Sequence, residues 1–293
     1  MLSMPPTPST PQAASLPAHA AYADALARVH DRIEQARSDA GLASSGVSDS
    51  GDATSSVRLL LATKTQDAAA VRAAAQADRA AGRGASVLVG ENRVQELTEK
   101  APALADLGLT AHLIGPLQSN KVNHALRALA RHGRGCIETV DSLALAEKIG
   151  SRVLASAGTH ASPAAAQGSD HIEPSAPSAS AVLDVYVQVN VSGEESKAGV
   201  SPDAAVDLAL AVAEVSGLRL SGFMTIGARS TDEGLVRAGF ARLREIRDEV
   251  AGSGALGTQG ARELSMGMSQ DLEWAVAEGA TIVRVGSAVF GAR

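Results

Sequence analysis

A single lysine ends a run of branched apolar residues near position 60. Residues 57–63 are rich in leucine, and Lys64 follows them directly. Such a run is typical of a buried β-strand, so it would place the amine of Lys64 at the strand's carboxyl end. Ligands of parallel α/β sheets lie at that end. The amine is therefore either an ordinary solvated strand cap or a nucleophile that forms a Schiff base with an aldehyde.

Two short loops near the C-terminus have the composition of a phosphate site. Ser265 ends one predicted strand, and Gly286 and Ser287 follow the next. Small residues let backbone N–H groups approach an anion, and hydroxyls add donors. In (β/α)8 barrels a phosphate commonly lies between the loops that follow the seventh and eighth strands. These three residues are therefore predicted to bind phosphate, whereas Ser269 is also explained as a helix cap.

An arginine precedes the second of these loops. Arg284 lies two residues before Gly286, so strand alternation places both on one face. This cation either binds the phosphate or faces a pyridine nitrogen, which it would keep unprotonated. The competing interpretation is a salt bridge to a strand-end carboxylate such as Glu91. Together with Lys64 and the phosphate loops, Arg284 outlines a ligand with an aldehyde, an aromatic nitrogen and a phosphate, and pyridoxal 5′-phosphate has all three.

Alternating strand and helix patterns would bring these residues together. The predicted strands are 57–63, 86–90, 111–115, 136–140, 182–191, 219–226, 262–265 and 281–285. The predicted helices between them are 68–81, 94–107, 119–131, 142–155, 202–216, 232–251 and 270–277. Eight βα units in a chain of 293 residues predict an α/β fold, a (β/α)8 barrel of the TIM type. Apolar residues at helical spacing also predict an added N-terminal helix, with Tyr22, Leu26, Val29, Ile33 and Ala36 on one face.

The predicted fifth strand has one apolar and one polar face. Its odd positions from 183 to 191 are Leu or Val, and its even positions are Asp184, Tyr186, Gln188 and Asn190. In a barrel the apolar face packs on helices and the polar face lines the interior, with Gln188 and Asn190 near the mouth. The alternative is a half-solvated antiparallel strand.

Composition divides the chain into a tail and one domain. Residues 1–17 are rich in Pro, Ser, Thr and Ala and are predicted to be a disordered tail. Residues 18–293 are predicted to form a single PLP-binding barrel, with a disordered insertion at 155–181 that is rich in Ala, Ser, Gly and Pro. The tail lacks the basic start and apolar core of a signal peptide, and no apolar run reaches the ~20 residues of a membrane span. We therefore expect a cytoplasmic protein.

Charge and cysteine content exclude other classes. The net charge is −6, aromatic residues make up 2%, and no basic stripe is present, which disfavours nucleic acid as a partner. Cys136 is the only cysteine, so it forms no internal disulfide and contributes to no cysteine cluster for a metal. We expect it to be a small buried apolar residue and expect no metal site.

Six segments resemble, in order, the motifs of the pyridoxal phosphate homeostasis protein family. They are ATKT at 62–65, GENRVQE at 90–96, HLIGPLQSNK at 112–121, VNV with SKAG at 189–199, LSMGMSQD at 264–271 and VRVGSAVFG at 283–291. The resemblance spans residues 57–293 and leaves out the tail and the insertion. It implies a fold like the amino-terminal barrel of alanine racemase. It also implies a protein that binds and manages pyridoxal 5′-phosphate, with no established catalytic reaction and with apo-enzymes as possible recipients.

The resemblance implies roles for individual residues. Lys64 would form the Schiff base, Arg284 would face the pyridine nitrogen, and Asn92 and Met224 would line the ring. The implied cofactor-binding residues are Lys64, Asn92, Met224, Ser265, Arg284, Gly286 and Ser287.

One departure concerns a second amine. Gln66 occupies a position where the family often has a second lysine, so the resemblance implies no role here for an amine at that position in handing over the cofactor. Lys197 retains a second lysine near the predicted mouth, where it is either a second cofactor amine or a solvated loop lysine.

Two enzyme classes compete with the carrier. A racemase of amino acids needs a proton donor on each face of its substrate, and in alanine racemase a second domain supplies one as a tyrosine. The sequence ends at Arg293, and its tyrosines, Tyr22 and Tyr186, are not at predicted strand ends, which favours the carrier. A barrel enzyme for sugar phosphates with an imine-forming Lys64 would explain the phosphate loops but not the set of motifs.

Overall fold

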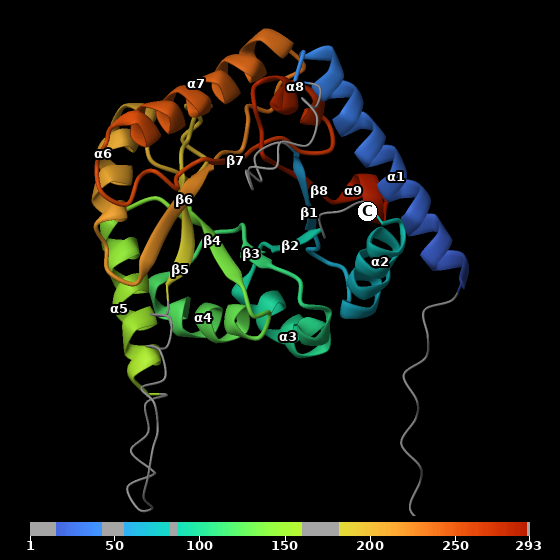
Figure 1. Ribbon diagram of the computed structural model, residues 1–293, viewed down its shortest axis with the longest axis horizontal. Helices are drawn as coiled ribbons and strands as arrows, with labels where there is room; N and C mark the ends of the chain where they lie inside the picture. The colour runs from blue at the N-terminus through green and yellow to red at the C-terminus, as the bar shows by residue number, and fades with distance from the viewer. Residues whose placement is uncertain (1–15, 43–55, 83–86, 160–181, 292–293) are drawn as a thin grey trace, which may run out of the picture.

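The computed structural model describes residues 16–42, 56–82, 87–159 and 182–291. Eight parallel strands form a closed barrel in the order of the sequence, with helices around it (Figure 1). The strands are β1 (Arg58–Ala62), β2 (Leu88–Glu91), β3 (Ala111–Leu113), β4 (Gly135–Val140), β5 (Leu183–Gln188), β6 (Leu218–Met224), β7 (Glu263–Ser265) and β8 (Ile282–Val285). The predicted (β/α)8 barrel is confirmed. All strand carboxyl ends therefore meet at one mouth.

Helices follow the strands and cover the outside of the barrel. They are α2 (Ala68–Ala80), α3 (Val94–Leu104), α4 (Val122–Ala130), α5 (Leu143–Thr159), α6 (Pro202–Ala213), α7 (Glu233–Gly252) and α8 (Leu272–Ala277). Asp67 and Asp232 cap α2 and α7, because each side chain accepts a hydrogen bond from a backbone N–H in the first turn. The predicted helix at 94–107 is divided, since α3 ends at Leu104 and a 3-10 turn (Ala105–Leu107) follows.

The added helix α1 (Leu16–Asp39) lies along α2, α8 and α9 (Ser287–Phe290) on the side of the barrel where the strand order closes (Figure 1). Leu26, Val29 and Ile33 are buried there, as the helical spacing predicts. The ring of Tyr22 packs edge-on against Phe290, with ring centroids 5.7 Å apart. The predicted N-terminal helix is confirmed.

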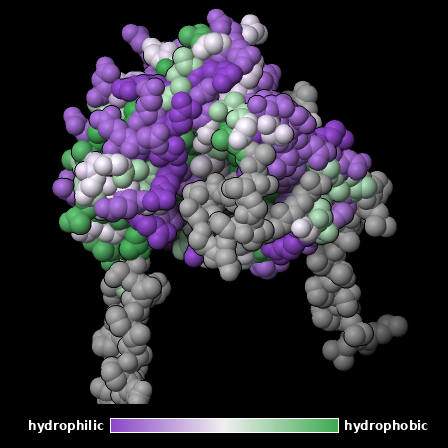
Figure 2. Space-filling model, turned by 45° about the horizontal axis from the view of Figure 1, so that its top comes forward, coloured by the Kyte–Doolittle hydropathy of each residue, from purple (hydrophilic) through white to green (hydrophobic). Residues whose placement is uncertain are grey.

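Apolar side chains fill both the helix layer and the inside of the barrel. The inner cluster consists of Leu60, Leu88, Ile114, Cys136, Tyr186, Met224 and Ile282. The barrel is therefore a packed core rather than a channel, and a ligand can approach only from its ends. Cys136 is buried and free, as predicted. The face shown in Figure 2 is mainly hydrophilic, with hydrophobic side chains in small separate groups.

Strand β5 is shorter than predicted and parallel to both neighbours. It pairs with β4 and β6 in parallel register, so the antiparallel alternative is wrong. Val185 and Val187 belong to the outer core and Tyr186 to the inner cluster, as alternation requires. Asn190 lies beyond the strand, where its amide donates to the carbonyl oxygens of Glu194 (2.9 Å) and Lys197 (3.1 Å). Asn190 therefore lies just past the carboxyl end of β5, on the side of the mouth as predicted, and its amide holds the loop that follows the strand.

Other predicted segments fall partly outside the described residues. Of the predicted tail, residues 1–15 lie outside them, and Leu16 and Pro17 begin α1. Of the predicted insertion, residues 155–159 end α5 and residues 160–181 lie outside the described chain. None of the helices in the described ranges combines the length and apolar character needed to cross a membrane. Within the same ranges, no group of three or more His, Cys, Asp or Glu could hold a metal ion.

Candidate cofactor-binding site

Lys64 lies in the turn that follows β1, at the mouth of the barrel. Its side chain is exposed and makes no hydrogen bond or ion pair with any described residue. The turn is closed by a hydrogen bond of 3.0 Å from the Gln66 N–H to the Thr63 carbonyl oxygen. Thr65 has a φ of 66°, which is unusual for a residue with a branched Cβ. The structure therefore presents a free amine on a turn whose backbone is held in a specific conformation.

Two elements clamp this turn from one side. The Nζ of Lys100, in α3, donates to the Thr63 carbonyl oxygen (2.8 Å) and to Oε1 of Glu91 (2.9 Å). The Thr63 hydroxyl also donates to Glu91, and the Thr65 N–H donates to Oε2 of Glu96 (3.2 Å). Burial raises the pKa of Glu91 above its ordinary value, although Thr63 and Lys100 oppose that effect. Residues on both sides of Lys64 are thus anchored to β2 and α3.

The loop after β8 lies against the strand that leads to Lys64. Leu61 pairs with Val285, and a Cβ placed on Gly286 would be 3.1 Å from the carbonyl oxygen of Ala62. Gly286 precedes the short helix α9, and the Ser287 hydroxyl lies 3.5 Å from that of Ser269 in the loop after β7. The structure therefore brings together the two loops that the sequence predicts to hold a phosphate.

Arg284 is buried beside these loops, with an exposed fraction of 5%. Its Nη1 donates to the Ser265 hydroxyl (2.8 Å) and its Nη2 to the Thr225 carbonyl oxygen (2.6 Å). The alternative salt bridge with Glu91 is wrong, because Glu91 is paired with Lys100. Burial lowers the pKa of Arg284, whereas the charges of Glu138 and Asp271 favour the cation. A guanidinium remains protonated in such surroundings.

Glu138 connects Ser265 to the far side of the barrel interior. Its carboxylate is fully buried and accepts from the Ser265 hydroxyl (2.6 Å) and from Nδ1 of His112 (2.5 Å). Burial alone would raise the pKa of Glu138, but its contacts with His112, Arg284 and Ser265 lower it below the ordinary value. The Ser265 hydroxyl has one proton, so it can donate to a phosphate only by giving up this bond to Glu138.

Asn92 provides a test of whether a ligand fits. It follows β2, and Gly115 touches it so closely that a Cβ there would lie 2.0 Å from the Asn92 carbonyl oxygen. The Asn92 Oδ1 atom is buried and has no partner among the described residues. An unpaired buried polar atom costs about 1–3 kcal/mol unless a ligand satisfies it. The free amine of Lys64 suits an aldehyde, and the two adjacent loops with hydroxyl groups suit a phosphate. The buried cation of Arg284 suits a ring nitrogen, and the unpaired amide oxygen of Asn92 suits a ring hydroxyl. The residues therefore fit pyridoxal 5′-phosphate.

Comparison with known proteins shows the family to which this chain belongs. The family model of the alanine racemase N-terminal domain matches residues 53–293. The pyridoxal phosphate homeostasis protein of Pseudomonas aeruginosa is 38% identical over 271 residues, which cover 92% of this chain and 95% of that protein. That of Escherichia coli K12 is 33% identical, with the same two shares covered. The chain belongs to the pyridoxal phosphate homeostasis protein family. The family predicted from the sequence motifs is confirmed.

Several solved structures resemble this pyridoxal phosphate homeostasis family member. An unknown protein from Bifidobacterium adolescentis is 38% identical, with a TM-score of 0.75 over 94% of this chain and 97% of the other. PipY of Synechococcus elongatus, solved with PLP bound, is 28% identical, with a TM-score of 0.63 over 92% of this chain and all of PipY. Alanine racemase of Clostridium difficile is 14% identical with a TM-score of 0.59, a likeness that shows the fold alone.

The two remaining residues predicted from the sequence, Met224 and Lys197, lie at the same end of the barrel. Met224 ends β6 and is buried in the inner cluster, so only its edge can line a ligand. Lys197 is not a freely solvated loop lysine, since its Nζ donates to Oε1 of Glu194 (2.6 Å) and to the Gly227 carbonyl oxygen (2.8 Å). It bridges the loops after β5 and β6, and its amine is engaged.

Two residues of the site, Lys100 and Glu138, were not predicted from the sequence. Lys100 lies one turn beyond the GENRVQE segment, and helical spacing from Glu96 was the signal that could have placed it on the same face. Glu138 is a lone carboxylate inside the otherwise uncharged strand β4. An acidic residue at an inward-facing strand position indicates a buried partner, and this was the signal available for Glu138.

Proposed function

We propose that this protein binds pyridoxal 5′-phosphate at the mouth of the barrel and carries it reversibly through a Schiff base with Lys64. The observation that carries the proposal is the exposed Lys64 in the turn after β1, the strand that the loop of Gly286 contacts at Ala62. Every other lysine discussed above is engaged, whereas Lys64 is free among the described residues. The bound PLP of PipY, a structural relative at 28% identity, supports the same cofactor here.

The other residues position the cofactor. Gly286 and Ser287 bind the phosphate through backbone N–H groups and the Ser287 hydroxyl, and Ser265, at the end of β7, contributes by holding Arg284. Arg284 faces the ring nitrogen and holds it unprotonated, because the guanidinium cannot accept its proton. Asn92 satisfies its unpaired amide on the ring hydroxyl, and Met224 lines the ring. When bound, the cofactor supplies an aldehyde that exchanges between amines.

We favour a carrier over the racemase alternative. A racemase needs a second proton donor facing its substrate. Tyr186 is buried in the inner cluster, where burial raises its pKa well above the ordinary value. Tyr22, on α1, packs against Phe290 of α9. Neither tyrosine of the chain is placed for this role, and the similar curated proteins are named for cofactor homeostasis.

Borohydride trapping tests the cofactor site. Purified protein mixed with pyridoxal 5′-phosphate should develop a visible absorbance band, and reduction followed by peptide mapping should place the adduct on Lys64. Lys64→Ala should abolish the band, whereas Lys148→Ala, an exposed lysine on α5, should leave it unchanged. Adduct on other lysines with an unmodified Lys64 would refute the assignment.

Transfer of the bound cofactor tests the carrier role. Loaded protein mixed with the apo-form of a PLP-dependent enzyme should restore that enzyme's activity. The restoration should be faster than with free cofactor supplied at the concentration that is unbound in the solution of loaded protein. Such transfer in the cytoplasm is part of the proposal. Racemisation of an amino acid at enzymatic rates, lost in Lys64→Ala, would instead establish the racemase.

A further inference from the structure

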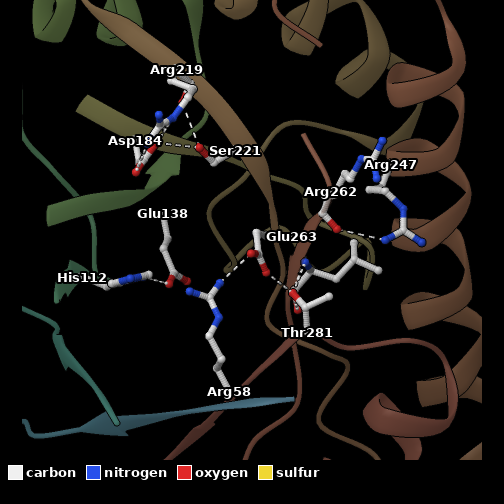
Figure 3. A network of polar contacts seen from close by, with 11 residues as sticks. Arg58, His112, Glu138, Asp184, Arg219, Ser221, Arg247, Arg262, Glu263 and Thr281 are labelled. Carbon is white, nitrogen blue, oxygen red and sulfur yellow. Dashed lines mark hydrogen bonds and ion pairs between the residues drawn. The ribbon is translucent and has the colours of Figure 1, made fainter. Parts of the chain in front are cut away.

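The binding function described above does not use the most deeply buried carboxylate of the barrel. Glu138 lies on β4 with an exposed fraction of 0%, and His112 lies beside it on β3 with 2% (Figure 3). Nδ1 of His112 is 2.5 Å from Oε1 of Glu138. Because an ionised carboxylate can only accept, the hydrogen of the imidazole must be on Nδ1. The pair is thus an oriented imidazole and an anion inside an apolar cluster.

This pair reaches the cofactor site through one hydroxyl. Oε2 of Glu138 accepts from Ser265 (2.6 Å), and the same Ser265 oxygen accepts from Nη1 of Arg284 (2.8 Å). A donated bond from Ser265 to Glu138 directs the hydroxyl lone pairs toward Arg284. The Thr225 carbonyl oxygen holds the other terminal nitrogen at 2.6 Å. The guanidinium therefore has its orientation set by two acceptors, one of which depends on Glu138.

Charge supports the same connection. The anions whose charges favour protonated Arg284 are Glu138 and Asp271. Asp271 directly precedes α8, and its Oδ1 accepts from the Met268 N–H (2.5 Å). A buried carboxylate without a cation or donors would be strongly unfavourable, so Glu138 and Arg284 stabilise each other through Ser265.

We propose that His112 and Glu138 are positioning residues for the cofactor, and that they act by fixing Ser265 and Arg284 and by setting the negative charge behind the ring. This inference rests on the proposed function, because it needs the cofactor ring to face Arg284. Neither residue touches the cofactor. Their effect is on the orientation of the guanidinium and on the electrostatic potential at the ring.

The test is an isosteric change of charge. Glu138→Gln keeps the shape and an acceptor for Ser265 but removes the anion. The midpoint pH at which the absorbance band of the Lys64 adduct changes should fall by about one unit, because losing a nearby anion disfavours the protonated form. The apparent Kd for pyridoxal 5′-phosphate should rise by about tenfold, the effect of one weakened hydrogen bond to a charged group. Glu138→Asp, which keeps the charge, should retain the wild-type midpoint.

Cys136→Ala is the matched control. Cys136 lies on the same face of β4, in the apolar cluster, and takes no part in these hydrogen bonds. If Glu138 has only a structural role, Glu138→Gln should lower the melting temperature, as Cys136→Ala does, and leave the midpoint pH unchanged. That result would overturn the inference. If Glu138→Gln does not fold, His112→Gln replaces it, with a smaller shift in the same direction expected. Failure of the wild-type protein to form any adduct at Lys64 would instead refute the proposed function.

Discussion

At the scale of single residues, the chemistry of the site depends on groups that hold Lys64 rather than on Lys64 alone. The lysine is carried by a turn in which Thr65 has a φ of 66°. Such a backbone persists only where its surroundings determine it. Here the surroundings are Lys100, Glu91 and Glu96, which bind the residues on both sides. The position of the Lys64 amine is therefore set by side chains of β2 and α3.

Lys100→Met tests this clamp. The change keeps the length of the side chain and removes a donor to Thr63 and the only cation beside the buried Glu91 among the described residues. We expect a loss of about 3 kcal/mol in the free energy of unfolding, because a buried charge loses its partner. We also expect about tenfold weaker binding of pyridoxal 5′-phosphate, because the turn is released. Urea unfolding and absorbance titration measure the two effects.

A double variant separates these effects. Adding Glu91→Gln to Lys100→Met removes the unpaired carboxylate, so most of the stability should return. The turn would still lack its donor, so cofactor binding should remain weak. Full recovery of binding in the double variant would show that Lys100 acts only through stability.

At the scale of elements, the pattern of the sequence predicted the strands well and the short connections poorly. Leucine-rich β1 and valine-rich β5 carry signals of several residues, and both were located. The helix α9 has four residues, which is too short for helical periodicity to be visible. Strand alternation was extended to Asn190, beyond the point where β5 ends, and the amide of Asn190 bonds within the loop that follows. Contacts between strands, such as Glu138 with Ser265, depend on barrel register and could not be derived from local sequence.

The close contact between the β8 loop and β1 makes Gly286 a second target. A Cβ in Gly286→Ala would lie 3.1 Å from the Ala62 carbonyl oxygen, so the loop or β1 must shift. We expect about tenfold weaker binding of pyridoxal 5′-phosphate, because the backbone N–H groups move away from the phosphate. Pyridoxal, which lacks the phosphate, should bind equally to both proteins. Gly252→Ala is the control, since nothing lies within 4 Å of a Cβ there. An equal loss for both ligands would contradict a phosphate role.

At the scale of the whole molecule, the two ends of the barrel have different tasks. The carboxyl end carries Lys64 and the predicted phosphate loops. The opposite end, where the strands begin, holds ion pairs between side chains of different strands (Figure 3). Arg58 of β1 pairs with Glu263 of β7 at 2.7 Å, and Arg219 of β6 pairs with Asp184 of β5. In barrels of this type, that end serves stability and the carboxyl end serves function.

Asp184→Asn tests this division through its dependence on pH. Arg219 Nη2 and the Ser221 hydroxyl donate to the Asp184 carboxylate at 2.8 and 2.7 Å. Burial acts to raise the pKa of Asp184, but these two donors and the charge of Arg219 lower it below its ordinary value. The ionised form is therefore favoured by folding. Its contribution is complete above the pKa of the unfolded chain, about 4, and is lost as the pH falls through the lower value of the folded protein.

The variant should accordingly lose about 1 kcal/mol of unfolding free energy at neutral pH, and the difference from wild type should shrink as the pH falls below about 4. Urea unfolding across this pH range measures it. Asp248→Asn, which removes an exposed partner of Arg247 on α7, should change stability little at any pH. Affinity for pyridoxal 5′-phosphate should be the same in all three proteins, because Asp184 lies at the end of the barrel opposite Lys64. A weaker affinity in Asp184→Asn alone would show that the two ends are coupled.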